Sequence, residues 1–436
     1  MDDVGAIFEV PSAPAELARL AEERSCPLGL LERMLALRYP RWKIEMVLSG
    51  DPFPTMDMWV AEVVDRERLA HGLAVHEATW EDDERLSDLF ANSPERLGDW
   101  DVIVERSPNP FAQQRLQDNA HVKLVVDRGV ALAASAYSGR SSIVAGQRVS
   151  VGWMGGWRVR EGFRRNGYSN LLLNSPGSSS SVFGMVTYWY VRLANSTANT
   201  WISHAVRDID SGSDRPLDKR TASVVHLDAA ADSSAADRTA ADRTDGQTDG
   251  RVRPANLEDL PRCVELINAT HDGLDLFRPY TAESLENRLH DLYWGPKPPF
   301  TPVVYAWADF AVLVDDGDIV ACGGLWDRGR DVRERWRHRE TGAEHVLDPT
   351  YLMDFGFEPG HEADMAALIG HHVATTRHLG RSSLVAALEF LPAVTEHLTW
   401  AAPSVESRSI ESMGFASPDI RVDATIARPY TDLAYW

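Results

Sequence analysis

Two similar segments, one in each half of the 436-residue chain, restrict the folds open to it more than any other feature. Residues 75–90 read VHEATWEDDERLSDLF and residues 252–267 read VRPANLEDLPRCVELI, and they align without a gap. Each predicts a short strand, then a Thr or Asn helix cap with acidic residues in the first turn, then an amphipathic helix. The chain is therefore expected to contain the same strand–helix unit twice.

A second correspondence lies downstream of each segment. Residues 123–137 (KLVVDRGVALAASAY) and 312–326 (VLVDDGDIVACGGLW) both consist of an apolar run, an Asp/Gly turn and a second apolar run. This pattern is typical of a β-hairpin. Two agreements in the same order predict two copies of one domain, and chance similarity between amphipathic patterns is the alternative.

The stretch between the two copies differs from them in composition. Residues 228–250 (DAAADSSAADRTAADRTDGQTDG) contain no aromatic or large aliphatic residue. Such a segment cannot bury enough apolar area to offset the entropy lost on ordering, so a flexible acidic linker is predicted. The predicted units are a helical N-terminal extension (1–72), a first domain (73–227), this linker (228–250) and a second domain (251–436).

Charge and cysteine content restrict the partners and the compartment. A formal net charge of −21 disfavours nucleic acid and anionic membranes as partners and favours a cationic one, although a solvated acidic surface explains the same value. No apolar run is long enough to span a bilayer. Cys26, Cys263 and Cys322 form no CxxC pair, which fits a reducing cytoplasm. Assembly into a homodimer stays open.

Residues 149–172 place glycines and positive charge at the junction of a strand and a helix. The run 149–159 (VSVGWMGGWRV) predicts a strand, and its three glycines favour a bulge or the close approach of a ligand. Arginines and Gly167 follow, and a leucine-rich helix is expected to begin near Gly167. The N–H groups and dipole at a helix start attract anions, and arginines add charge-assisted hydrogen bonds. The junction therefore predicts a diphosphate site.

The loop matches neither the Walker motif nor the dinucleotide glycine fingerprint. Its Arg-x-x-Gly-x-Ser pattern, between a strand and a helix, resembles the acetyl-CoA loop of the GCN5-related N-acetyltransferase (GNAT) family. That resemblance implies an α/β (α+β) chain with two GNAT-like domains, each a mixed, mostly antiparallel splayed sheet flanked by helices. It also implies an N-acetyltransferase that moves an acetyl or short acyl group from acetyl-CoA, as cosubstrate, to an amine of a small molecule or peptide.

The resemblance assigns residues by their position in the family pattern. Ser169 stands where the family usually has Gly or Ala. The implied acetyl-CoA-binding residues are Arg164, Arg165, Asn166, Gly167, Tyr168 and Ser169 in the loop, Trp157, Arg158 and Val159 along the pantetheine arm, and Asn195 beside it.

The catalytic acid is not where many relatives have it. The tyrosine of the family pattern falls near Ile202, which cannot protonate a leaving thiolate. Tyr188 and Tyr190, on an expected strand at 182–191, or Tyr168 on the loop, are candidate replacements, with structural packing as the alternative role. No obvious base is present, and Glu105, Glu161 and His204 are weak candidates. These gaps leave open an acyl-CoA-binding scaffold without catalysis, or an acyl-CoA decarboxylase or S-acyltransferase.

The second copy departs from the pattern at its own loop. Residues 358–364 (EPGHEAD) contain no arginine and three acidic residues, so loss of acyl-CoA binding is predicted. Ile410 replaces a tyrosine that the family has before its Met-Gly-Phe corner. The histidines that follow lack metal-ligand spacing, so no metal site is predicted and surface or capping positions are expected for them. They are His361, His371, His372 and His378.

Overall fold

The computed structural model describes part of each half of the chain. The described ranges are 26–36, 73–107, 109–144, 146–164, 166–174, 186–192, 215–228, 250–290, 303–388, 390–398 and 405–416, together with single positions in the N-terminal 72 residues and Leu433. For residues 186–192 and 405–416, and for 215–228 except Leu227, the description covers the backbone only. The linker predicted at 228–250 lies almost wholly outside these ranges, so that prediction stays open.

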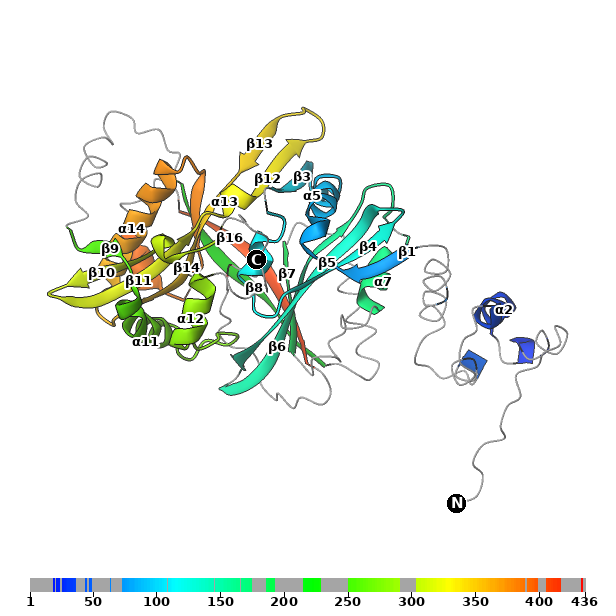
Figure 1. Ribbon diagram of the computed structural model, residues 1–436, viewed down its shortest axis with the longest axis horizontal. Helices are drawn as coiled ribbons and strands as arrows, with labels where there is room; N and C mark the ends of the chain where they lie inside the picture. Colours follow the sequence, from blue (N-terminus) through cyan, green and yellow to red (C-terminus); the bar gives the residue numbers. More distant parts are fainter. Residues whose placement is uncertain are drawn as a thin grey trace, which may run out of the picture.

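Within the described residues, twelve strands form one continuous sheet, in the order β1-β4-β5-β6-β7-β16-β8-β15-β14-β11-β10-β9 (Figure 1). The first half of the chain supplies β1 (Leu73–Glu77), β4 (His121–Asp127), β5 (Val130–Val144), β6 (Gln147–Val159), β7 (Val186–Arg192) and β8 (Arg215–Asp228). The second half supplies β9 (Val252–Pro254), β10 (Phe310–Asp315), β11 (Asp318–Trp326), β14 (Thr350–Phe357), β15 (Ser383–Ala386) and β16 (Val405–Ala416).

Helices cover both faces of this sheet, and the two predicted helix caps are confirmed. Thr79 with Asp82, and Asn256 with Asp259, each form a capping box in the short 3₁₀ turn before a helix. The helices of the main body are α5 (Asp83–Ala91), α6 (Ala112–Arg115), α7 (Tyr168–Asn174), α11 (Leu260–Thr270), α12 (Ala282–Leu289), α13 (Arg328–Asp331), α14 (Glu362–His378) and α15 (Pro392–His397).

The two predicted hairpins are β4–β5 and β10–β11, and their turns have the same backbone conformation. Arg128 and Gly129 have φ values of 47° and 85°, and Asp316 and Gly317 have 47° and 93°. Superposing these turns places Val125 on Leu313, and a bulge follows each of those two residues. The sequence alignment of 123–137 with 312–326 is therefore displaced by one residue, because similar apolar runs do not define register whereas turn geometry does.

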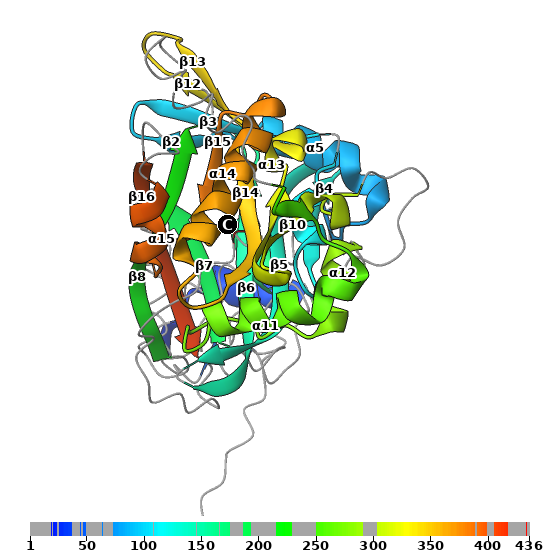
Figure 2. The same ribbon diagram turned by 90° about the vertical axis from the view of Figure 1, so that its left-hand side faces the viewer.

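The halves of the chain exchange their last strands. β8 pairs with β15 of the second half, and β16 lies between β7 and β8 (Figure 2). The sheets expected for two separate domains are thus joined into one. Exchange leaves neither β7 nor β15 as an open edge, where unpaired backbone groups would invite aggregation.

A second, smaller sheet also connects the halves. It has the order β13-β12-β3-β2, with β2 (Glu95–Leu97) and β3 (Trp100–Arg106) from the first half and β12 (Val332–His338) and β13 (Glu344–Leu347) from the second. Glu105, one of the candidate bases, forms an ion pair with Arg335 across the β3–β12 ladder. That pairing favours a structural role for this carboxylate.

One large hydrophobic core is shared by the two halves, a second cluster consists of second-half residues and Leu227 of β8, and a third lies within the first half. The shared core includes Leu89, Trp153, Trp326 and Tyr351, on the face covered by α5 and α11. On the opposite face, α7 packs in one cluster and α14 in another. The three cysteines are buried and form no disulfide.

The N-terminal extension contains α2 (Leu28–Ala36), which lies beyond β1 in Figure 1. Its buried residues, such as Leu31 and Met34, form a cluster among themselves with other positions from the first 72 residues. No helix in the part of the chain that the structure describes has the length and apolar character needed to cross a membrane.

The last turn of α7 is held by a buried tyrosine. The Tyr137 hydroxyl accepts a hydrogen bond from Ser135 Oγ (2.9 Å) and donates one to the Leu172 carbonyl (3.3 Å). Residue 176 is a proline, so it has no N–H to continue the helical ladder to that carbonyl. Burial raises the pKa of Tyr137 to about 12, so its hydroxyl stays protonated and able to donate.

Replacing Tyr137 with phenylalanine should lower the free energy of unfolding by about 1–2 kcal/mol, because the Leu172 carbonyl and the Ser135 hydroxyl each lose a hydrogen bond to the phenol. Urea denaturation measures the change. Tyr305→Phe is the control, since the Tyr305 hydroxyl is buried without a hydrogen-bond partner among the described residues. Equal losses in the two variants would show that the Tyr137 hydrogen bonds contribute nothing.

Candidate functional site

The glycines of β6 form a bulge. The β5–β6 register passes from Gly155 opposite Ala136 to Arg158 opposite Ala134, so two residues of β6 face one residue of β5. Gly156 lies in the bulge with a φ of 61°, which residues with a side chain rarely adopt. The bulge, one of the two readings of these glycines, is confirmed.

β6 and β7 diverge next to this bulge. They pair in parallel only from Val151 opposite Val186 to Trp153 opposite Tyr188. β6 then continues to Val159 and β7 to Arg192, and no pairing between them is described beyond that point. We call this divergence the splay, formed by residues 154–159 of β6 and 189–192 of β7. It is the opening that a splayed sheet was predicted to have.

The predicted anion loop follows β6 and ends at a helix, as expected. Gly162 and Gly167 have φ values of 86° and 77°, so both turns need a residue without Cβ strain. α7 begins at Tyr168, and the Gly167 carbonyl accepts a hydrogen bond from the Leu171 N–H (3.2 Å). The first turn of a helix presents N–H groups that have no acceptor within the helix, so this end of α7 can receive an anion.

Arg164 holds the loop in place from within. Its guanidinium donates to the Val159 carbonyl at the end of β6 (3.5 Å) and to the Pro94 carbonyl. Burial lowers the pKa of Arg164, because its guanidinium is partly withdrawn from water. In this structure the side chain connects the loop to the strand and to the segment after α5.

The other predicted pantetheine and loop residues divide between the two faces of β6. Arg158 forms an ion pair with Glu95 (2.8 Å) on the α5 side. Trp157 and Val159 pack on the α7 side with Tyr168. Asn166 is exposed and donates to a loop carbonyl. These residues surround the end of β6, while contact with a ligand stays a prediction for each of them.

Four predicted positions allow no statement about side chains. Arg165 and Asn195 lie outside the described residues, as does Ile202. The backbones of Tyr188 and Tyr190 lie in β7, opposite Gly414 and Ser412 of β16. Tyr188 belongs to the last β6–β7 pair, so its backbone lies where the splay closes.

The second half has the same bulge and divergence, but aromatic residues pack there. Asp354, with a φ of 47°, takes the place of Gly156, and β14 pairs with β15 only through Thr350 and Tyr351. The rings of Phe355 and Phe390 stack with their centroids 6.3 Å apart, and the centroid of the His271 ring lies 5.0 Å from that of Phe355. Phe390 follows β15. Side chains of the chain itself therefore pack beside the point where β14 and β15 diverge.

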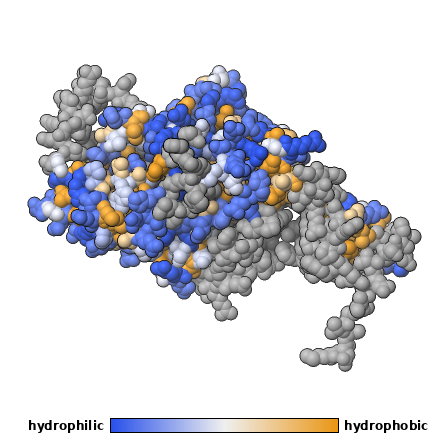
Figure 3. Space-filling model, in the orientation of Figure 1, coloured by the Kyte–Doolittle hydropathy of each residue, from blue (hydrophilic) through white to orange (hydrophobic). Residues whose placement is uncertain are grey.

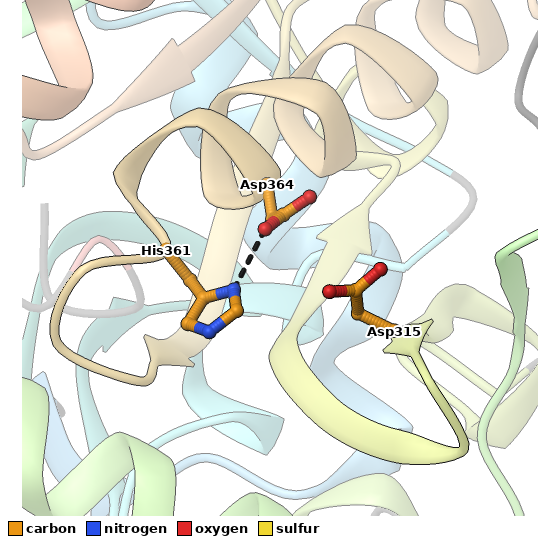
Figure 4. A group of neighbouring side chains, drawn as sticks. All are labelled: Asp315, His361 and Asp364. Atoms are coloured by element: carbon orange, nitrogen blue, oxygen red, sulfur yellow. Dashed lines mark hydrogen bonds and ion pairs between the residues drawn. The ribbon is translucent and has the colours of Figure 1, made fainter.

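The start of α14 is surrounded by the chain's own charges (Figure 4). His361 Nδ1 lies 2.7 Å from an Asp364 carboxylate oxygen, and this contact raises the pKa of His361. One nitrogen of Arg251 lies 3.0 Å from Asp364 and 3.2 Å from Asp315. His361, Asp364 and Asp315 are close enough to share a cation, but the arginine already supplies positive charge to both carboxylates.

The prediction of surface or capping positions is wrong for one histidine. His372 is buried, and its Nε2 lies 3.2 Å from the Gly323 carbonyl. Burial lowers the pKa of His372 to about 3, so the ring is neutral. The sequence pattern did not reveal this because α14 is buried on a broad face, where a neutral imidazole is tolerated when it is hydrogen-bonded.

Comparisons with known proteins find similar folds among solved structures. No family model and no curated protein matches the sequence. Two crystal structures of Saccharomyces cerevisiae N-myristoyltransferase with bound myristoyl-CoA are similar, with TM-scores of 0.53 and 0.52 and identities of 11% and 10%. The matches cover 82% of this chain in both cases, and 80% and 84% of the yeast chains.

A GCN5-related N-acetyltransferase from Sphaerobacter thermophilus also matches, with a TM-score of 0.41 and 13% identity over 83% of this chain and 98% of that one. N-myristoyltransferase is a GNAT-fold enzyme. Because the chain is structurally similar to the yeast enzyme, it has a GNAT-like fold, as the loop pattern had implied.

Proposed function

We propose that this chain, which has a GNAT-like fold, is an acyl-CoA-dependent N-acyltransferase that holds its acyl-CoA in the splay. The observation that carries the proposal is the continuity of three features: the divergence of β6 from β7, the glycine-containing loop after β6, and the start of α7. Together they supply a strand edge for an amide-containing arm and a helix end for a diphosphate.

The diphosphate would lie against the start of α7. Gly167 brings the backbone close to the ligand, and Ser169 adds a small hydroxyl-bearing residue to the first turn. Arg164 fixes the loop through the Val159 and Pro94 carbonyls, and the adjacent Arg165 is the arginine that we assign to the phosphates. A charged ligand at a helix start gains from both the dipole and the N–H groups.

The pantetheine arm would extend along β6 towards the last β6–β7 pair. Its two amides are suited to strand-like hydrogen bonds with residues 157–159, and the thioester would then lie near residues 153–155. The acceptor amine attacks the thioester carbonyl, a C–N bond forms, and the C–S bond breaks. The amine loses its proton to water, and a phenol protonates the thiolate, for which Tyr188 and Tyr190 are our candidates. Much of the rate would come from holding the two reactants together.

The second half has a structural part in this proposal. Its strand β16 pairs with β7 along residues 410–415, so it holds the far wall of the splay. The coloured residues in Figure 3 are predominantly hydrophilic, and together with the net charge of −21 they favour a polar, cationic amine as the acceptor. A small molecule and a peptide both satisfy this chemistry.

Calorimetric titration with acetyl-CoA tests the proposal. Because hydrogen bonds to charged groups contribute about 1.5–3 kcal/mol each, acetyl-CoA should bind at least about ten-fold more tightly than S-acetylpantetheine, which lacks the diphosphate. Absence of binding, or equal affinity for the two compounds, would refute the site.

Incubation with labelled acetyl-CoA and a panel of amines, peptides and aminoglycosides then separates the activities. Label in the amine fraction is the expected result. Binding without transfer or thiol release would support the scaffold alternative. Free CoA without any amine acceptor would support decarboxylation or S-acyl transfer.

A further inference from the structure

The closed end of the splay is occupied by one large side chain. Trp153 belongs to the last β6–β7 pair, directly before the strands diverge. It is only 7% exposed and belongs to the core on the α5 side of the sheet. Any group that follows β6 inward from the loop therefore meets this residue at the end of its path.

The indole lies against the bare backbone of Gly155. A Cβ built on Gly155 would be 2.1 Å and 2.4 Å from two carbons of the Trp153 ring, so no other residue fits there without moving the ring. Position 155 therefore requires glycine because a side chain would collide with the ring. Position 156 requires glycine for a different reason, since its φ is positive. It lets the indole lie flat along β6, over the site where the splay begins.

Two further boundaries of this end lie within the described residues. Ahead, the paired backbones of Val151–Trp153 and Val186–Tyr188 leave no space between the strands. Met154 lies on the opposite face of β6, because successive side chains of a strand alternate between faces. Its side chain is 6% exposed. A ligand that follows β6 from the loop thus reaches Trp153 and the paired backbones where the splay closes.

We infer that the acyl group is short and that Trp153 sets its length, an inference that rests on the proposed acyl-CoA site. The acyl carbon skeleton beyond the thioester would meet the indole on the α5 side of β6. A short acyl chain would fit against the ring edge, whereas a longer one would require the ring to move. The GNAT-like fold alone does not impose this, because the similar yeast structures contain myristoyl-CoA.

Replacing Trp153 tests the inference by the affinities of two acyl-CoAs measured calorimetrically on the full chain. The wild-type protein should bind acetyl-CoA about ten-fold or more tightly than hexanoyl-CoA, given the size of discrimination that apolar pockets achieve per methylene. Trp153→Ala and Trp153→Leu should shift this ratio towards hexanoyl-CoA by about ten-fold or more, with the acetyl-CoA affinity changed much less.

Tyr351→Ala is the matched control. Tyr351 occupies the equivalent position of β14, is 4% exposed and packs edge-to-face on Trp326. Its loss should leave the ratio of the two affinities unchanged. Circular dichroism establishes that each variant is folded before titration.

The outcomes separate this inference from the proposed function. If neither acyl-CoA binds the wild-type chain, the acyl-CoA site itself is refuted. If acetyl-CoA binds but hexanoyl-CoA binds equally well, the site stands and the role of Trp153 is overturned, whatever the stability of the variants. Folded Trp153 variants that keep the wild-type ratio overturn it as well.

Discussion

Replacing Gly167 with valine is expected to weaken acetyl-CoA binding by about 100-fold or more. Gly167 has a φ of 77°, a conformation that costs a residue with a side chain about 1–2 kcal/mol. The added side chain would also keep the diphosphate from the first turn of α7, where a hydrogen bond to a charged group contributes about 1.5–3 kcal/mol. Calorimetric titration of the variant measures the affinity.

Gly162→Val is the matched control for backbone strain. Gly162 lies in the same loop with a φ of 86°, and nothing lies within 4 Å of a Cβ built on it. Its substitution imposes a similar strain without approaching the helix end. A similar loss of affinity in both variants would mean that loop stability, and not contact with the diphosphate, explains the effect.

Replacing Arg288 with methionine should destabilise the protein by about 3–5 kcal/mol, because removing one partner of a buried ion pair leaves an uncompensated charge. Arg288 lies 3.3 Å from the Asp354 carboxylate, and both side chains are at most 4% exposed. Tyr280 connects them, donating to Asp354 (2.6 Å) and accepting from Arg288 (2.5 Å). Urea denaturation measures the free energy of unfolding.

The double variant Arg288→Met with Asp354→Asn should recover part of this loss, since no lone charge is then buried. Arg96→Met, which breaks the exposed pair with Glu161, should cost less than about 1 kcal/mol. A loss at Arg288 no larger than that at Arg96 would show that the buried pair does not stabilise the second half.

The comparison of Asp354 with Gly156 shows where sequence reasoning loses information. A glycine at position 156 predicted a bulge from its residue type. Asp354 adopts the same left-handed conformation, with a φ of 47°, but an aspartate at that position does not predict it. Its side chain contacts Tyr280, which precedes α12, and Arg288 in α12. Such a partner is set by packing, and no spacing rule predicts it.

Arg164 shows the same limit at the candidate site. The motif placed it correctly at the loop between β6 and α7, yet its guanidinium contacts carbonyls of Val159 and Pro94. Pro94 is distant in sequence, so only the fold brings the two together. Trp153 is a further case, because a tryptophan two residues before a glycine pair reads as an ordinary core residue until its ring is seen against Gly155.

The sequence by itself determined the local elements: the capped helix starts at Thr79 and Asn256, the hairpin turns, and the strand–loop–helix junction that ends at Gly167. These depend on residues a few positions apart, whose backbone preferences and hydrogen bonds act locally. The tertiary structure alone decided the exchange of β8 and β16, the contact of the Trp153 ring with Gly155, and the packing of aromatic rings at the second divergence. Those features depend on contacts between distant segments, which are selected by packing a common core and satisfying strand edges.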